Sequence, residues 1–321
     1  MKRNLLLGAS VTALFLCLLE GGLRLSGRVA TDTLRSPDLE TLERIPGVFE
    51  PNKQFVDRIR PELAYRVKIN SLGFRGREID AGKRPGSVRI ICLGDSYTFG
   101  HYVDDDEAFP AVLERLLRAR RRATEVINAG VNGFSIVDEL ALFREKVLAL
   151  DPDIVVLVFS QNDILDLARP RPMIELMRDH ARLKSVFILG PTLKVLQHTA
   201  LFNAMQRVAA GLRGGRRDAV AATLQDRASE LWNAYHARLA QFAALARTRD
   251  IRVLLVAWPS ARQVAGDAVL TPNRRLERFA GELGIAFLDL TDPLRSLLRR
   301  GVEPTLAPRD GHPSPAGHEG A

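Results

Sequence analysis

The chain has 321 residues, enough for one large or two ordinary domains, and 46% of them are hydrophobic, so a substantial core is available. Its formal net charge is +8, but the basic residues are scattered and usually stand beside acids, which argues against a nucleic-acid-binding surface. Cys17 and Cys92 lie in apolar runs, which excludes a disulfide framework or a cysteine metal site as the organising feature.

The N-terminal segment 1–25 combines early cations with an apolar run. Lys2 and Arg3 precede an uncharged stretch at 5–19, which as a helix would span about 22 Å of the ~30 Å hydrocarbon core. Continuing to Leu25 would complete the span if the charged side chains reach toward the interfaces. A cleaved signal peptide is the alternative, but no cut site here has suitable small residues. We predict an uncleaved single-pass anchor in the inner membrane, with residues from about 26 onward in the periplasm or outside.

Residues 26–86 form a polar extension that is rich in proline and glycine. The alternating stretch 64–76 predicts a short strand and a turn. No independent core is evident in this extension, so we expect it to pack on the domain that follows.

From residue 87 onward, short apolar runs alternate with amphipathic segments. The apolar runs predict strands at 88–94, 124–130, 153–160, 251–258 and 285–290, and the amphipathic segments predict helices at 106–121, 135–150 and 226–250. Three of the strands are nearly continuously apolar, as is typical of strands covered on both faces. The alternation predicts an α/β domain over 87–321: a three-layer α/β/α architecture with a five-stranded parallel sheet.

A long segment at about 164–224 interrupts this alternation between the third and fourth strands. Connections of this length are usually functional or mobile. A lid over the site, a surface that lies on the membrane and an ordinary helical insertion all fit its mixed pattern.

Polar residues follow directly after three of the predicted strands. Ser96, Gly133 and Asn162 stand just past the carboxyl ends, where open parallel sheets collect their sites. A serine nucleophile needs a base, an orienting partner for that base and donors for the oxyanion. His312 follows Asp310 by two residues in a polar loop after the last strand, so both can reach the same edge.

The other histidines have weaker cases as the base. His101 could line the site because it follows Ser96 closely, and His318 looks like the start of a packed helix. Three more lie in helical, surface-like patterns: His180, His198 and His236.

Four motifs, in order, resemble those of the SGNH hydrolases, also called GDSL-type esterases. They are "GDSYTFG", "INAGVNGFS", "SQND" and "DGHPSPAGH". The resemblance covers 88–321 apart from the insertion, and it implies the flavodoxin-like SGNH fold and a serine carboxylester hydrolase without cofactor or metal. It implies that Ser96 is the nucleophile, His312 the base and Asp310 its partner. The oxyanion hole would be formed by the backbone N–H groups of Ser96 and Gly133 and by the Asn162 amide.

The chain departs from the family pattern in three places. Ser160 stands where the third block usually has glycine, so the local backbone is expected to differ slightly. The last block is Asp-x-His rather than the commoner Asp-x-x-His, a spacing that recurs in the branch that acts on bacterial surface polysaccharides. The sequence stops at Ala321, where the family usually continues into a closing helix. Asp95, directly before Ser96, is expected to fix the turn rather than to act in the triad.

These features predict a membrane-anchored hydrolase that faces the periplasm and removes O-acetyl groups from an envelope carbohydrate. The same residues could instead transfer the acyl group to a sugar hydroxyl, as an O-acetyltransferase of extracellular polysaccharide. A lipid esterase or thioesterase is a third alternative, which the apolar insertion keeps open. A non-catalytic carbohydrate-binding protein is the fourth, and the intact Ser96, Asn162 and His312 argue against it.

Overall fold

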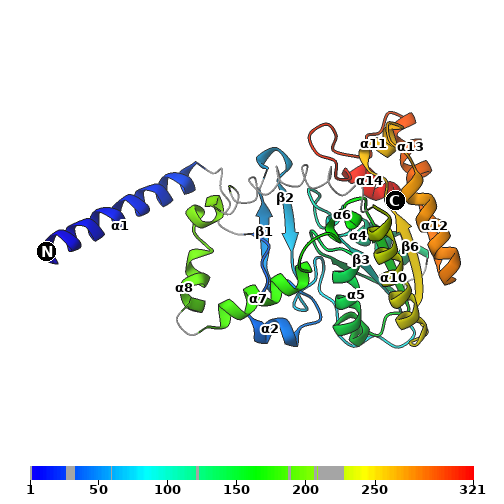
Figure 1. Ribbon diagram of the computed structural model, residues 1–321, viewed down its shortest axis with the longest axis horizontal. Helices are drawn as coiled ribbons and strands as arrows, with labels where there is room; N and C mark the ends of the chain where they lie inside the picture. Colours follow the sequence, from blue (N-terminus) through cyan, green and yellow to red (C-terminus); the bar gives the residue numbers. More distant parts are fainter. Residues whose placement is uncertain are drawn as a thin grey trace.

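A computed structural model describes residues 2–26, 33–58, 60–120, 123–186, 189–205, 208 and 228–321 (Figure 1). Its centre is a five-stranded sheet in the order β4-β3-β5-β6-β7, in which all neighbours are parallel. The strands are β3 (Val88–Gly94), β4 (Thr124–Gly130), β5 (Ile154–Phe159), β6 (Arg252–Ala257) and β7 (Ala286–Asp289). The apolar runs predicted β3 and β4 to the residue, and the other three strands are one residue shorter at each end.

Helices cover both faces of this sheet, which confirms the predicted three-layer α/β/α architecture. On one face, the main core joins the sheet to α5 (Ile136–Glu145), α10 (Ala228–Arg247) and α12 (Thr271–Leu283). On the other face, a second core joins it to α4 (Phe109–Arg120), α11 (Ala261–Ala265) and α13 (Thr291–Arg299). The short helix η2 (Val147–Leu150) leads from α5 to β5. Ile91 and Leu93 of β3 are fully buried, as expected for a strand between two apolar layers.

The order of the strands determines where a site can form. Strand β3, second from one edge of the sheet, pairs with β4 on one side and with β5 on the other. The chain therefore adds β4 on one side of β3 and then crosses to add β5 on the other side. Ligand sites in open α/β sheets lie at such a point, where the strand order reverses. The loops that follow β3, β4 and β5 meet there.

The N-terminal extension packs on the domain and shares its core. It contains α2 (Leu39–Arg44), η1 (Pro61–Leu63) and an antiparallel ribbon of β1 (Gln54–Asp57) with β2 (Tyr65–Lys68). The buried side chains of Phe55, Val67 and Phe74 belong to the same apolar cluster as the main sheet. The sequence predicted β2 but not its partner β1, which is only four residues long.

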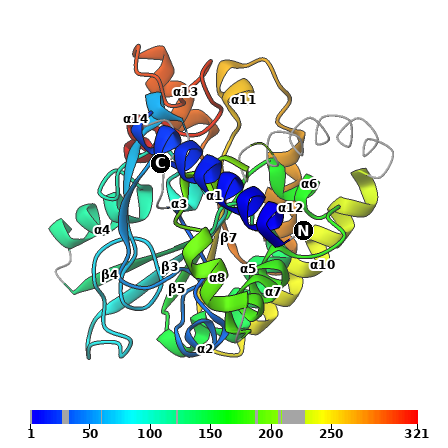
Figure 2. The same cartoon turned by 90° about the vertical axis from the view of Figure 1, so that its left-hand side faces the viewer.

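The first helix, α1 (Lys2–Leu25), projects away from the body of the molecule (Figures 1 and 2). Near its end, Glu20 accepts hydrogen bonds from the backbone N–H groups of Ala200 and Leu201, at 2.9 and 2.8 Å. Among the residues whose side chains are described, no helix has both the length and the apolar character needed to cross a membrane. The start of the predicted anchor, residues 1–9, lies outside those residues. The transmembrane helix predicted over 1–25 is therefore not supported by the described part of the chain.

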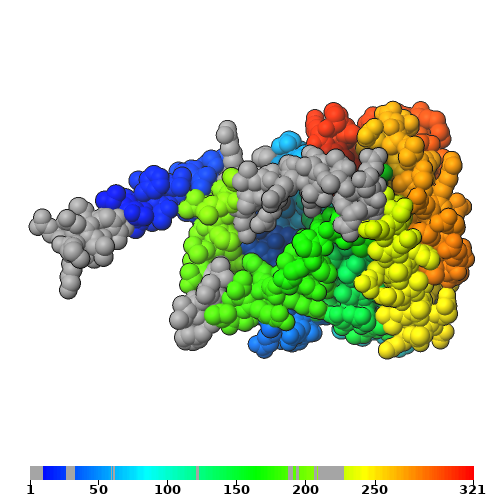
Figure 3. All heavy atoms as spheres, viewed as in Figure 1, coloured from blue at the N-terminus to red at the C-terminus, as the bar shows by residue number. Residues whose placement is uncertain are grey.

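The segment between β5 and α10 is helical where it is described. It contains α6 (Asn162–Asp166), α7 (Met173–Ser185) and α8 (Leu189–Leu196), whereas 206–207 and 209–227 lie outside the described residues. The buried Ile174 of α7 joins the main core, and its backbone N–H donates to Asp138 of α5 at 2.9 Å. Figure 3 shows a hollow beside α7, with atoms of the blue N-terminal extension inside it. The first part of the predicted insertion is thus packed against the domain.

Candidate active site

Ser96 stands at the carboxyl edge of the sheet, directly after β3. It is the first residue of the short helix α3 (Ser96–Phe99), and Asp95 caps this helix by accepting a hydrogen bond from the N–H of Tyr97 at 2.9 Å. The helix packs closely on β4, because a Cβ on Gly130 would lie only 2.3 Å from the nitrogen of Phe99. The expected role of Asp95 in fixing the turn agrees with this cap, and Asp95 is fully buried.

The C-terminal tail, residues 300–321, places His312 next to Ser96. Its Nε2 lies 2.9 Å from the Ser96 hydroxyl oxygen, and its Nδ1 contacts Oδ1 of Asp310. The same carboxylate oxygen accepts the backbone N–H of His312 at 3.0 Å. Because an ionised carboxylate only accepts, the ring carries its proton on Nδ1 and presents the lone pair of Nε2 to the hydroxyl. The three residues form one hydrogen-bonded line across more than 200 positions of sequence.

Asp310 is held in its ionised form. Burial by itself raises the pKa of this carboxyl, but the hydrogen bonds from the ring and backbone of His312 outweigh it, and the charge of Arg60 adds to them. Together they lower the pKa of Asp310 to about 2. The carboxylate is therefore charged at neutral pH and stabilises a proton on the imidazole.

The residues expected to form the oxyanion hole lie on the neighbouring loops. Gly133 has φ +79°, a left-handed conformation that strains any residue with a Cβ, which explains the glycine in this loop. Within the described ranges, the N–H groups of Ser96 and Gly133 donate to no protein acceptor. Asn162 begins α6, and its Nδ2 donates to Oδ2 of Asp95 at 2.8 Å. One amide proton of Asn162 is thus used next to the serine turn, and the other makes a long hydrogen bond of 3.4 Å to Oδ2 of Asp166, which an oxyanion would replace.

Ser160 takes part in this network through its side chain. The residue is buried, with its hydroxyl oxygen 2.8 Å from Oδ2 of Asp95 and 2.6 Å from Oδ1 of Asn162. A hydroxyl has one proton, so it donates to one of these acceptors at a time. The sequence predicted only a slightly different backbone at position 160. The structure shows in addition that the Ser160 hydroxyl links Asp95 to Asn162.

An arginine that the sequence did not single out links the Gly133 loop to α6. Arg169 donates from Nη1 to the carbonyl of Gly133, and its Nη2 pairs with Asp166 at 2.6 Å. Asp166 in turn lies 3.4 Å from Nδ2 of Asn162. Arg169 and Asp166 lie just past the third motif, where no sequence pattern distinguishes them from an ordinary helical ion pair.

His101 lines the site, as the sequence suggested. Its ring centroid lies 5.1 Å from that of His312, and its Nδ1 contacts the Tyr65 hydroxyl at 2.8 Å. Burial, with a contribution from His312, lowers the pKa of His101 to about 3, so its ring is neutral. Next to it, Tyr102 adopts φ +70°, a strained conformation for a large side chain, and its ring faces His312 edge-on.

The loop that carries His101 and Tyr102 is held by an arginine of the extension. Arg75 is buried and donates to the carbonyls of Phe99, Gly100 and Val103 at 2.8, 2.5 and 2.7 Å. No sequence pattern indicates this role, because it depends on contacts between segments about 25 residues apart.

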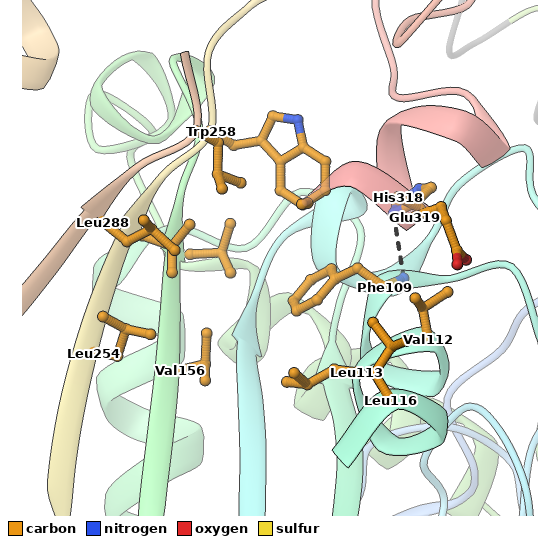
Figure 4. Close-up of a pocket in the computed structure, with 14 residues that line it drawn as sticks. Phe109, Val112, Leu113, Leu116, Val156, Leu254, Trp258, Leu288, His318 and Glu319 are labelled. Carbon is orange, nitrogen blue, oxygen red and sulfur yellow. Dashed lines mark hydrogen bonds between the residues drawn. The ribbon is translucent and has the colours of Figure 1, made fainter. Parts of the chain in front are cut away.

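His318 lies in a separate place, as its packed-helix pattern suggested. It belongs to α14 (Pro315–Gly320), is buried, and accepts the N–H of Phe109 on Nδ1 at 3.3 Å. Figure 4 shows it at the rim of an apolar cavity of about 150 Å³ between α4 and the sheet. Within the described ranges, no three His, Cys, Asp or Glu side chains are grouped as metal ligands.

A comparison with protein families identifies the family of this chain. Residues 92–319 match the model of the GDSL-like lipase/acylhydrolase family, so the chain belongs to that family and is an enzyme that hydrolyses ester bonds. No curated protein matches the sequence significantly.

Solved structures with a similar arrangement include the following two. One is a G-D-S-L family protein, described as lipolytic, from Desulfitobacterium hafniense (16% identity, 73% of this chain and 94% of that chain covered, TM-score 0.45). Another is an acetylxylan esterase from Geobacillus stearothermophilus (18% identity, 74% and 92% covered, TM-score 0.44).

Proposed function

We propose that the chain is a serine carboxylester hydrolase with Ser96, His312 and Asp310 as its catalytic residues. The observation that carries this proposal is the 2.9 Å contact between the Ser96 hydroxyl and Nε2 of His312, whose other nitrogen meets Asp310. Ser96 attacks the ester carbonyl while His312 takes its proton, and the charge of Asp310 stabilises the imidazolium. His312 then protonates the leaving alcohol, and the same steps run with water to release the acid.

The oxyanion of each tetrahedral intermediate is held by the backbone N–H groups of Ser96 and Gly133 and by the amide of Asn162. The loops after β3, β4 and β5 carry these groups to one edge of the sheet. Such preorganised donors act where charge develops in the transition state, and each is typically worth ~2.7–4 kcal/mol.

The substrate we propose is an O-acetylated carbohydrate of the cell envelope. Three cavities of the described residues are lined by neither Ser96 nor His312, so none of these cavities offers the serine a deep tunnel for a long acyl chain. The half-buried rings of Tyr97 and Tyr102 flank His312 at centroid distances of 5.3 and 5.5 Å. Flat aromatic faces with a polar tip suit the apolar faces and hydroxyls of a sugar.

A serine-directed fluorophosphonate tests the nucleophile. We expect the purified full-length chain to be labelled at Ser96 and the Ser96→Ala variant to be unlabelled. Labelling that persists in Ser96→Ala would exclude the assignment.

Two assays then test the substrate class. We expect acetate release from acetylated glycans, and p-nitrophenyl acetate turnover that exceeds that of longer-chain esters. Faster turnover of long acyl chains would favour a lipid esterase or thioesterase. Acetyl transfer to added glycan in preference to water would favour an O-acetyltransferase.

We propose further that α1 attaches the protein to the inner membrane with the catalytic domain in the periplasm. The described part of α1 exposes apolar side chains, including Leu14, Phe15 and Leu18 at 61%, 62% and 66%. A reporter fused after residue 30 should be active only outside the cytoplasm. Reporter activity inside the cytoplasm would reject this proposal.

A further inference from the structure

The carboxylate of Asp310 uses its two oxygens for different partners. Oδ1 accepts from the ring and the backbone N–H of His312, whereas Oδ2 lies 3.2 Å from Nη1 of Arg60. Arg60 belongs to the N-terminal extension, about 250 residues earlier in the chain. Each oxygen of the proposed catalytic carboxylate thus has a cationic or N–H partner.

Arg60 holds the tail as well as the carboxylate. Its Nη1 also donates to the backbone carbonyl of Arg309 at 2.7 Å, so one guanidinium group binds two consecutive residues, Arg309 and Asp310. The same group lies over the ring of Tyr102, 5.9 Å from its centroid. These contacts place Arg60 between the strained Tyr102 loop and the loop that presents His312.

The tail needs such an anchor because little regular structure supports it. Between α13 and α14, residues 300–314 form one isolated bridge, Thr305 with Pro313, and a few turn hydrogen bonds, such as the N–H of Leu306 to the carbonyl of His312 at 2.9 Å. Because only one residue separates Asp310 from His312, Oδ1 of Asp310 accepts from both the ring and the backbone N–H of His312. Oδ2 is left for a partner from another segment of the chain. Arg60 is that partner.

We propose that Arg60 is a positioning residue of the active site, which fixes the Asp310 carboxylate and thereby the His312 ring against Ser96. This inference rests on the proposed roles of Ser96, His312 and Asp310, and it makes the N-terminal extension a part of the catalytic unit. Arg60 touches neither the serine nor the imidazole in the described contacts, so it acts through Asp310.

The charges around the pair support an electrostatic effect. Arg60 contributes to lowering the pKa of Asp310. The three titratable rings that pack against His312 are uncharged at neutral pH: burial lowers the pKa of His101 and raises the pKa of Tyr97 and Tyr102. Among the described residues, Arg60 is therefore the one permanently charged cation that contacts Asp310.

The test compares Arg60→Met, which keeps the aliphatic stem, with Arg60→Lys, which keeps a charge. The matched control is Arg66→Ala, because Arg66 belongs to the same extension and forms an exposed ion pair with Asp104, at 2.5 Å. The readouts are kcat and KM for p-nitrophenyl acetate, the rate of fluorophosphonate labelling at Ser96, and the thermal midpoint of the full-length chain.

We expect Arg60→Met to lower kcat and the labelling rate by about tenfold with little change in KM. Arg60→Lys should recover most of this loss, and Arg66→Ala should behave as wild type. The acid limb of kcat/KM should move to higher pH in Arg60→Met, because a cation that opposes protonation of the His312–Asp310 pair is gone. In an Asp310→Asn background, Arg60→Met should add little further loss.

Three results would overturn the inference. They are an Arg60→Met variant as active as Arg66→Ala, an Arg60→Lys variant as slow as Arg60→Met, and an undiminished Arg60→Met effect in the Asp310→Asn background. If the wild-type chain is not labelled at Ser96 at all, the proposed function fails first, and this inference with it.

Discussion

Ser96 and His312 lie within hydrogen-bond distance, but different parts of the architecture support them. Ser96 follows a strand that is buried from its second residue onward, and its turn is fixed by the buried Asp95 together with Ser160 and Asn162. His312 lies on a loop of the tail that is held by Asp310, by Arg60 and by a hydrogen bond from the Tyr97 hydroxyl to the carbonyl of Gly311, at 3.1 Å. The serine side is therefore built into the core, whereas the histidine side depends on a few polar contacts between distant segments.

This difference predicts two kinds of mutational response. Changes on the serine side should affect both activity and stability, because the groups there are buried. Changes on the histidine side should affect activity much more than stability, because the tail loop contributes little to the core.

The largest effect is expected from His312→Ala. Without its base Ser96 is a poor nucleophile, so kcat for p-nitrophenyl acetate should fall on the order of 10⁴-fold. The thermal midpoint should stay near that of wild type. His180→Ala is the matched control. His180 lies on α7 and lines a cavity with residues 33–36 that neither Ser96 nor His312 lines, so this variant should retain wild-type activity. Equal activity of the two variants would remove His312 from the mechanism.

Asn162→Ala should have the next largest effect. Loss of one oxyanion donor should lower kcat by about 10²–10³-fold. The midpoint of urea unfolding should fall too, because Asp95 loses a hydrogen bond in a buried site. Gln161→Ala, at the exposed neighbouring position, serves as the control. An Asn162→Ala variant with unchanged kcat would contradict its place in the oxyanion hole.

Ser160→Ala sharpens the comparison on the serine side. The substitution removes only the hydroxyl that links Asp95 to Asn162, so we expect a fall of about 1–2 kcal/mol in the free energy of unfolding. Activity should fall by about fivefold, because Asn162 keeps its bond to Asp95. Urea denaturation and kcat measured on the same samples check both values. A stability equal to wild type would show that the hydroxyl has no role in the network.

The pH dependence of stability tests the histidine side, where the expected effect is smallest. The pKa of Asp310 is lowered to about 2, below its value in an unfolded chain, so its stabilising contribution is present above the unfolded pKa. It is lost as the pH falls from ~4 through the folded pKa. Because the group is only partly buried, we expect the free energy of unfolding of the wild type to exceed that of Asp310→Asn by about 1 kcal/mol at neutral pH, an advantage that disappears in acid. An advantage that persists below the folded pKa would contradict the assignment.

The sequence predicted most of the sheet and the family motifs because both are local patterns. Continuous apolar runs identified the strands, and each motif lies within a dozen residues. The extension was harder: β2 was predicted, but β1, Arg60 and Arg75 were not, since their roles depend on partners elsewhere in the chain. The transmembrane helix at 1–25 is the prediction for which the described residues give no support.

The amino-acid sequence by itself determined the alternation of strands and helices, the polar turns after β3, β4 and β5, and membership of an ester-hydrolase family, because apolar periodicity and short motifs are written in neighbouring residues. Only the tertiary structure decided that Nε2 of His312 meets the Ser96 hydroxyl, that Ser160 joins Asp95 to Asn162, and that Arg60 reaches Asp310. Those contacts join segments between two and about 250 residues apart, and most of them exist only once the parallel sheet has brought its loops to one edge.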